Sequence, residues 1–121
     1  MKKTVRGNSI YITEEMSQDR LTIHEASEGE AVYLKLEGLI TSALAPGFEN
    51  EVLLASVCFE KVILDCSGCT SIFSGAVQSL LQAQKYVEKR GAYFELRNVP
   101  PVVMESFVSM GYDQILEIKE N

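Results

Sequence analysis

The sequence has few of the residues from which catalytic and metal sites are usually built. Among its 121 residues there is a single histidine, His24. Neither a GxGxxG loop nor a Walker-type GxxxxGK[ST] loop occurs, so the common phosphate-cradling glycine loops are missing. No serine or cysteine nucleophile stands beside His24 in sequence, although distant residues can converge in a fold. We expect no catalytic residue, no cofactor and no metal, and a protein that is not an enzyme.

The chain also lacks a long apolar stretch and an excess of basic residues. No run approaches the ~20 apolar residues that span a bilayer, and no apolar stretch of signal-peptide length follows the basic start at residues 1–7. The net charge is −6, and such an excess of carboxylates repels phosphate backbones and anionic lipid headgroups. We expect a cytoplasmic protein with no nucleic-acid partner and no membrane insertion.

Cysteines are scarce and odd in number, which argues against a disulfide framework. Cys66 and Cys69 have the spacing of a redox dithiol. Such a motif usually places its first thiol at a helix N-terminus, and here a further stretch precedes the expected helix. Two buried, apolar thiols are therefore favoured. Zinc is disfavoured because only Cys58 and His24 remain as further soft ligands.

A hydrophobic content of 46% suffices for one compact core. Two alternating segments, Leu21–Glu25 and Ala31–Glu37, flank a glycine-containing turn and predict an antiparallel hairpin. Before them, residues 1–20 form an N-terminal extension, with a short strand expected at Ser9–Thr13 and a polar loop at residues 14–20. Residues 21–121 are expected to form the domain itself.

The rest of the chain alternates helices and strands. Thr41 or Ser42 is expected to cap a helix that Pro46 helps to start. The remaining expected elements are a buried strand at Val62–Leu64 that ends in Asp65, a loop, a helix from about Ser74 to Arg90 stopped by Gly91, a strand at Ala92–Leu96, a helix opened by Pro100-Pro101 and stopped by Gly111, and a closing strand at Ile115–Ile118. This order predicts an α/β fold with a mixed sheet, which has an antiparallel hairpin edge, is otherwise largely parallel and is flanked by helices.

Functional groups in such sheets gather beyond the carboxyl ends of the strands. The segment after Val62–Leu64 is rich in small hydroxyl, thiol and glycine residues. Ser74 is expected at the helix N-cap, where a phosphate would meet free backbone N–H groups, although a simple capping role is the commoner one. Asp65 is expected to bond to nearby backbone N–H groups. The partner-binding candidates are Asp65, Ser67, Thr70, Ser71, Phe73, Ser74 and Gly75.

At this segment the sequence resembles a STAS domain, the module of bacterial anti-sigma factor antagonists. The resemblance runs from about Leu21 to Ile118. It rests on the hairpin, the turn at residues 38–41, the strand that ends in residues 65–69, the helix led by Ser74, the segment 91–98 and a final helix that ends at residues 110–112. It implies partner switching in transcription control: the antagonist binds an anti-sigma factor that is also a serine kinase, phosphorylation releases it, and a serine phosphatase resets it.

The family loop, Asp-Ser-Ser-Gly or Asp-Ser-Ala-Gly, fits this chain in two registers. Counted without gaps from Asp65, Phe73 replaces the acid, Ser74 matches the first serine and Gly75 takes the acceptor position. With a loop one residue shorter, Ser74 matches the acceptor serine and Gly75 its glycine. Ser74 is the phosphorylation candidate. The alternatives are a STAS-like regulatory subunit of a transport or signalling complex, or a thiol or phosphoryl-transfer enzyme that uses Cys66, Cys69 or Ser74.

Overall fold

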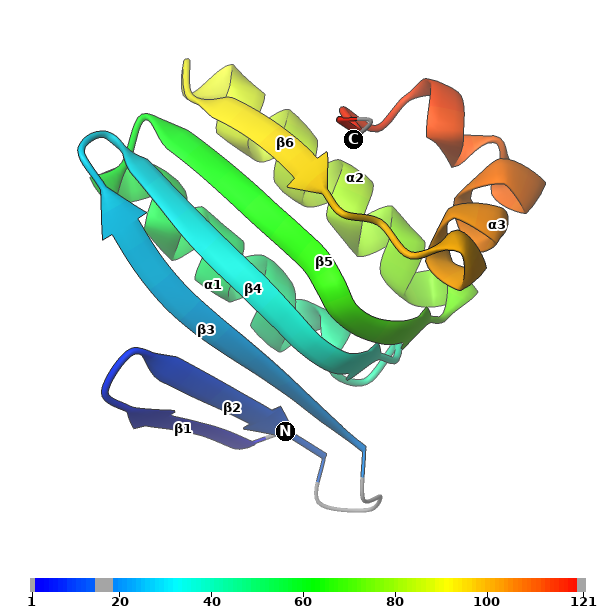
Figure 1. Ribbon diagram of the computed structural model, residues 1–121, viewed down its shortest axis with the longest axis horizontal. Helices are drawn as coiled ribbons and strands as arrows, with labels where there is room; N and C mark the ends of the chain where they lie inside the picture. Colours follow the sequence, from blue (N-terminus) through cyan, green and yellow to red (C-terminus); the bar gives the residue numbers. More distant parts are fainter. Residues whose placement is uncertain (1, 15–18, 120–121) are drawn as a thin grey trace.

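A computed structural model describes residues 2–14 and 19–119 of the chain (Figure 1). Strands and helices follow one another much as the sequence predicts. The elements are β1 (Lys2–Arg6), β2 (Ser9–Thr13), β3 (Arg20–Glu28), β4 (Ala31–Ile40), α1 (Ala45–Cys58), β5 (Lys61–Ile72), α2 (Ser74–Lys89), β6 (Tyr93–Arg97), α3 (Pro101–Met110) and the short 3₁₀ helix η1 (Tyr112–Gln114).

The six strands form one sheet in the order β1-β2-β3-β4-β5-β6. Strands β1 to β4 pair antiparallel, whereas β4–β5 and β5–β6 pair parallel. Each parallel pair is joined by a helix, α1 or α2, as parallel neighbours require a crossover. The predicted α/β fold with a mixed sheet and an antiparallel edge is confirmed, and the edge contains two hairpins rather than one.

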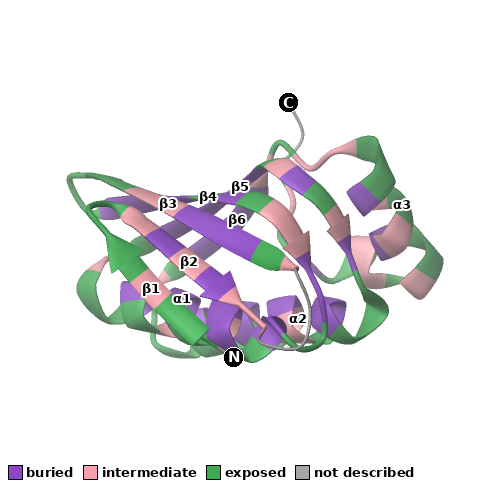
Figure 2. Ribbon diagram, turned by 90° about the horizontal axis from the view of Figure 1, so that it is seen from below, coloured by how far each residue is buried: buried purple, intermediate pink, exposed green. Residues whose placement is uncertain are grey.

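The helices α1 and α2 cover one face of the sheet, and α3 packs near the end of β5 (Figures 1 and 2). The core lies between that face and the helices, where Phe48 of α1 and Leu64 of β5 have no exposed surface. Within residues 2–14 and 19–119, no helix covers the opposite face of β1 to β4 (Figure 2). No helix in this part of the chain is long and apolar enough to cross a membrane.

The prediction of a loop after Asp65 is wrong, because β5 continues to Ile72. The expected turn at residues 38–41 is displaced for the same reason, since β4 runs to Ile40 and pairs with the second half of β5 through two irregularities in register. Cys66, Cys69 and Ile72 point into the core in this half of β5. Two thiols therefore occupy positions where a buried strand usually has Val, Ile or Leu. A search for those three residue types misses this half of the strand.

The predicted closing strand at Ile115–Ile118 is also wrong. η1 ends at Gln114, just before these residues, and only a single bridge joins Ile118 to Leu96 of β6. The side chain of Gln84 on α2 accounts for the difference: its amide nitrogen donates to the Ile115 carbonyl at 3.0 Å, and its amide oxygen accepts from the Glu117 N–H at 2.8 Å. A side chain thus takes bonds that a strand partner would otherwise supply.

The N-terminal hairpin is only half anticipated. The expected strand at Ser9–Thr13 is confirmed as β2, whereas β1 has no alternation of apolar residues and was not predicted. Lys3 of β1 forms an ion pair with Glu51, a carboxylate on α1 that is 7% exposed. This pair ties the sheet edge to the helix layer. Residues 15–18 of the polar loop expected at 14–20 lie outside the described residues.

Candidate functional site

The candidate segment centres on Phe73, Ser74 and Gly75 at the start of α2. The prediction that Ser74 caps the helix is wrong by one position: Phe73 has the extended backbone of an N-cap (φ −84°, ψ 151°), and Ser74 is the first helical residue. The Phe73 carbonyl accepts from the N–H groups of Ala76 and Val77, at 2.8 and 3.2 Å. No side chain caps this helix end, so the Ser74 hydroxyl is not used as a cap.

The start of α2 lies beside the turn that leads into α1. The Phe73 N–H donates to the Ile40 carbonyl at the end of β4 (3.0 Å). In the adjoining turn the Thr41 hydroxyl, expected as a helix cap, accepts from the Leu44 N–H at 3.2 Å, although α1 begins only at Ala45. The next residue, Ser42, lies directly against Gly75, and a side chain at position 75 would overlap its hydroxyl oxygen.

This surface combines an apolar side chain with polar groups and two helix N-termini. Phe73 is 50% exposed, and Ser42, Ser74 and Gly75 are also exposed. Neither α1 nor α2 has an acidic residue in its first turn. The positive ends of the two helix dipoles therefore give this end of the sheet a partial positive charge, which favours an anion.

Asp65 lies apart from this surface. It is separated from Ile72 by seven residues of extended chain, roughly 20 Å, and β6 ends beside it (Figure 1). Its Oδ1 accepts from the Ser67 N–H at 3.0 Å and from the Asn98 side chain at 3.2 Å. Partial burial acts to raise the pKa of Asp65, but the hydrogen bonds from Ser67 and Asn98, with the charge of Lys35, outweigh it and lower that pKa.

The remaining candidates are spread along the second half of β5. Ser67 and Thr70 are exposed, and the Thr70 hydroxyl donates to the Gly38 carbonyl of β4 at 3.1 Å. Ser71 is half-buried, and its carbonyl accepts from the Cys69 thiol at 3.5 Å. The structure therefore gathers Phe73, Ser74 and Gly75 in one place and leaves the other candidates on the strand that leads to them.

The thiols of Cys66 and Cys69 are free and buried. Burial, with the nearby Cys69 thiol and the Asp65 carboxylate, strongly raises the pKa of Cys66. Burial also raises the pKa of Cys69, against a smaller opposing effect of its hydrogen bond to Ser71. A redox dithiol needs an accessible thiolate, so this environment argues against thiol chemistry.

Distant residues do converge on His24. The Ser9 hydroxyl lies 2.9 Å from its Nδ1, and Glu37 Oε2 lies 2.5 Å from its Nε2. Serine catalysis also needs free backbone donors for an oxyanion, whereas the backbones of β2, β3 and β4 around this chain of hydrogen bonds pair with one another. We therefore interpret it as a cross-strand polar network on the open face of the sheet.

Two residues of this region were missed at the sequence level. Ser42 was considered only as a helix cap, and its contact with Gly75 joins segments 33 residues apart. Asn98 has a positive φ of 54°, a backbone conformation in which asparagine is enriched. That preference was the available signal for Asn98, and the sequence offered none for the contact of Ser42.

With this geometry in hand, comparison with known proteins identifies the family. The model of the "Mlab, STAS domain" family matches residues 23–117. The chain belongs to the STAS domain family. The STAS resemblance noted in the sequence is thereby confirmed, and no curated protein is similar enough in sequence to match.

Solved structures share the fold at low sequence identity. An anti-sigma factor antagonist from Mycobacterium paratuberculosis has a TM-score of 0.74 at 15% identity, over 87% of this chain and 90% of that one. The anti-sigma factor antagonist SpoIIAA in its unphosphorylated form has a TM-score of 0.66 at 15% identity, over 82% and 89% of the two chains. The structure of SLC26A9 has a TM-score of 0.68 at 15% identity, over 93% of this chain and 22% of that one.

Proposed function

We propose that this STAS domain is a non-enzymatic interaction module, an antagonist that binds an anti-sigma factor with serine kinase activity in a bacterial partner-switching pathway. The observation that carries the proposal is the exposed surface of Phe73, Ser74 and Gly75 at the start of α2, on a fold shared with anti-sigma factor antagonists. A half-exposed aromatic side chain rimmed by small polar residues has the composition of an interface anchor.

Within the proposal, Ser74 is the phosphorylated residue and a serine phosphatase reverses the change. The Ser74 side chain is exposed on the first residue of the helix, and Gly75 has no hydroxyl group that could accept a phosphate. This supports the register in which Ser74, not position 75, matches the acceptor. A phosphate there would add nearly two negative charges to a surface that must dock on the kinase. SpoIIAA has been solved in a phosphorylated as well as an unphosphorylated form.

The proposal also includes the expected location of the protein and the expected bounds of its domain. We infer a cytoplasmic location, the compartment in which a sigma-factor pathway operates. We also infer that residues 21–121 form the STAS unit and that residues 1–20 are an addition to it, since the family match begins at residue 23.

Binding and phosphorylation are tested separately. An affinity pull-down with the full chain, from the cell in which the protein naturally occurs, identifies the kinase. Phe73→Ala should then weaken binding by about 10- to 100-fold, the cost of losing an interface anchor. Tyr86→Ala is the matched control, because Tyr86 is an exposed aromatic residue (42%) further along the same helix. Equal affinities of the two variants would contradict the proposed surface.

Phosphorylation is tested with the captured kinase and ATP, followed by mass spectrometry of the intact chain and its peptides. One phosphate at Ser74 is expected, and none in Ser74→Ala. Ser42→Ala should still be modified, since Ser42 is the neighbouring exposed hydroxyl and serves as the control. Modification at Ser42 instead, or nowhere, would reject the phosphoswitch and leave the binding proposal intact.

A regulatory subunit of a transport or signalling complex is the second candidate. The match to SLC26A9 favours it, because nearly all of this chain aligns with about a fifth of a much longer protein. Copurification of a membrane permease and its ATPase, in place of a cytosolic kinase, would select this alternative.

A further inference from the structure

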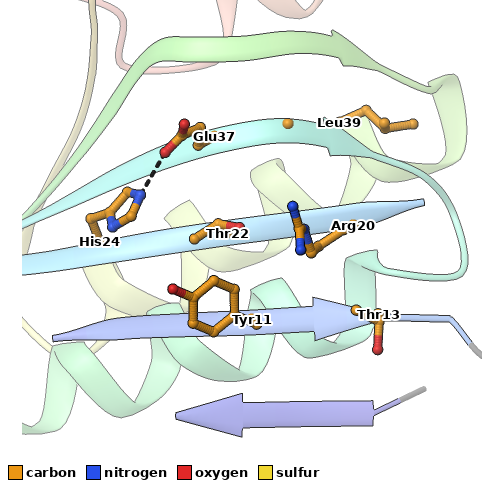
Figure 3. A pocket seen from close by; sticks show the side chains of 8 residues that line it. Tyr11, Thr13, Arg20, Thr22, His24, Glu37 and Leu39 are labelled. Atoms are coloured by element: carbon orange, nitrogen blue, oxygen red, sulfur yellow. Dashed lines mark hydrogen bonds and ion pairs between the residues drawn. The ribbon is translucent and has the colours of Figure 1, made fainter. Parts of the chain in front are cut away.

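The open face of the sheet has a polar, hollowed surface at its N-terminal edge (Figure 3). Because side chains alternate along a strand, Leu21 and Ile23 of β3 point to the helices, and Arg20, Thr22 and His24 point away from them. Tyr11 and Thr13 of β2 lie opposite Thr22 and Arg20 in the cross-strand register. The hollow they line has a volume of about 610 Å³ and reaches Glu37 and Gly38 on β4.

A second hollow, of about 390 Å³, continues the first toward the sheet edge. Tyr11, Thr13 and Arg20 line both hollows, and Thr4 and Arg6 of β1 complete the second one. We call the two together the hairpin groove. Four of its lining residues carry hydroxyl groups, and one of them, Thr22, is buried, with 8% of its surface exposed. The groove is thus a continuous concavity across β1, β2, β3 and β4.

The groove is basic on a chain that is acidic. The whole sequence has a net charge of −6, yet Arg6 and Arg20 line the same hollow. Among the salt bridges between residues of 2–14 and 19–119, none involves either guanidinium group. The carboxylate on the opposite wall, Glu37, is paired with His24. Two guanidinium groups that have no carboxylate partner among the described residues suit a dianion such as a phosphate, which each can bind through parallel N–H donors.

We propose that the hairpin groove binds a small, soluble phosphate monoester with a hydroxyl-bearing body. The phosphate lies between Arg6 and Arg20, beside the Tyr11 ring, and the body of the ligand meets the hydroxyl of Thr22 and the carboxylate of Glu37. A soluble source is favoured over a lipid headgroup because the net negative charge of the chain opposes an anionic membrane surface. Arg6, Tyr11 and Arg20 precede the matched segment 23–117, so the family match does not include the residues that would hold the phosphate.

The test is calorimetric titration of the full chain with glycerol 3-phosphate as the probe. Binding is expected, with weaker binding of inorganic phosphate and none of glycerol. The double variant Arg6→Gln/Arg20→Gln should weaken binding at least ~10-fold, since both charge-assisted contacts are lost. The matched control, Lys85→Gln/Lys89→Gln, removes the same charge from exposed positions on α2 and should change affinity less than ~2-fold.

Three results would overturn the inference. The first is no binding at 10 mM glycerol 3-phosphate, which would limit the binding free energy to less than about 3 kcal/mol. The second is equal weakening of binding by both double variants. The third is binding to phosphatidic acid vesicles without binding to the soluble probe. Thr22→Val provides a second measurement, because it leaves the charges in place. It should weaken the binding of glycerol 3-phosphate more than the binding of inorganic phosphate. Phe73→Ala should leave the titration unchanged, so failure of this inference is distinguishable from failure of the proposed protein partner.

Discussion

Gly38 is the position at which the packing of the sheet is most sharply testable. It lies in β4 with φ +111°, a backbone conformation that side chains rarely adopt. A Cβ atom there would also overlap the carbonyl oxygen of Arg20 on the neighbouring strand β3. Gly38→Ala therefore has two separate costs, one from the backbone angle and one from the contact.

The magnitudes add to a large effect. A positive φ costs an alanine about 1–2 kcal/mol, and forcing an atom into a closely packed site costs about 1–3 kcal/mol. The free energy of unfolding should thus fall by about 2–5 kcal/mol, a large part of the ~5–15 kcal/mol typical of a domain. The backbone of Arg20 cannot turn aside as a flexible side chain can, because Arg20 is paired with Thr13 of β2 and the next residue, Leu21, is paired with Gly38 itself.

Gly29→Ala separates the two costs. Gly29 lies in the turn between β3 and β4 with φ +60°, and a Cβ there meets nothing within 4 Å. It has the loss of unfolded-chain entropy and the smaller angular cost of the left-handed region, but not the contact. Urea unfolding followed by far-UV circular dichroism should show Gly38→Ala to be less stable than Gly29→Ala by at least about 1 kcal/mol. Equal stabilities would show that β3 and β4 separate freely here, which would refute the argument.

Three further predictions concern Asp65, the cysteines and Gln84. The pKa of Asp65 is lowered in the folded state. Its charge therefore stabilises the fold at pH values above its pKa in the unfolded chain, about 3.9, and this contribution is lost as the pH falls through the folded pKa. Asp65→Asn should flatten the decline of Tm below about pH 4, and an unchanged decline would contradict this. Iodoacetamide labelling of the native protein, measured by mass spectrometry, should modify the exposed Cys58 at least ~100-fold faster than Cys66 or Cys69. The two buried thiols can react only after local opening of the fold, and comparable rates would contradict their burial. Gln84→Leu should lower the free energy of unfolding in urea by about 1–3 kcal/mol, because two backbone groups of the C-terminal segment lose their partner. Hydrogen exchange of that segment should also accelerate. Unchanged exchange would show that the bonds are not formed.

Sequence patterns predict those elements whose signal is local. Alternation predicts β2 and the β3–β4 hairpin, and Gly91 and Gly111, both with positive φ, follow the ends of α2 and α3 as expected. A short continuous apolar run also predicts the buried strand β5 as far as Asp65. These features need only the residue types within one element.

The features that were missed depend on partners far away in the chain. β5 continues past Asp65 because β4 offers it a partner as far as Ile40. The segment after η1 is not a full strand because Gln84, more than 30 residues earlier, takes its backbone bonds. β1 carries mostly charged side chains, and its place at the sheet edge follows from pairing with β2 and from the ion pair of Lys3. None of these contacts has a signature within its own segment.

The two proposed binding surfaces share strand β4, which decides whether one affects the other. Glu37 and Gly38 line the hairpin groove, and the Ile40 carbonyl holds the Phe73 N–H at the start of α2. Coupling between two sites requires an element with two alternative arrangements. β4 is paired on both sides, with β3 and with β5, and Gly38 packs directly on the backbone of Arg20, so a shift of β4 would break both ladders together. We therefore expect ligand in the groove to leave affinity for the protein partner within ~2-fold. A larger change would show that the irregular pairing of β4 with β5 after Lys35 permits a second register.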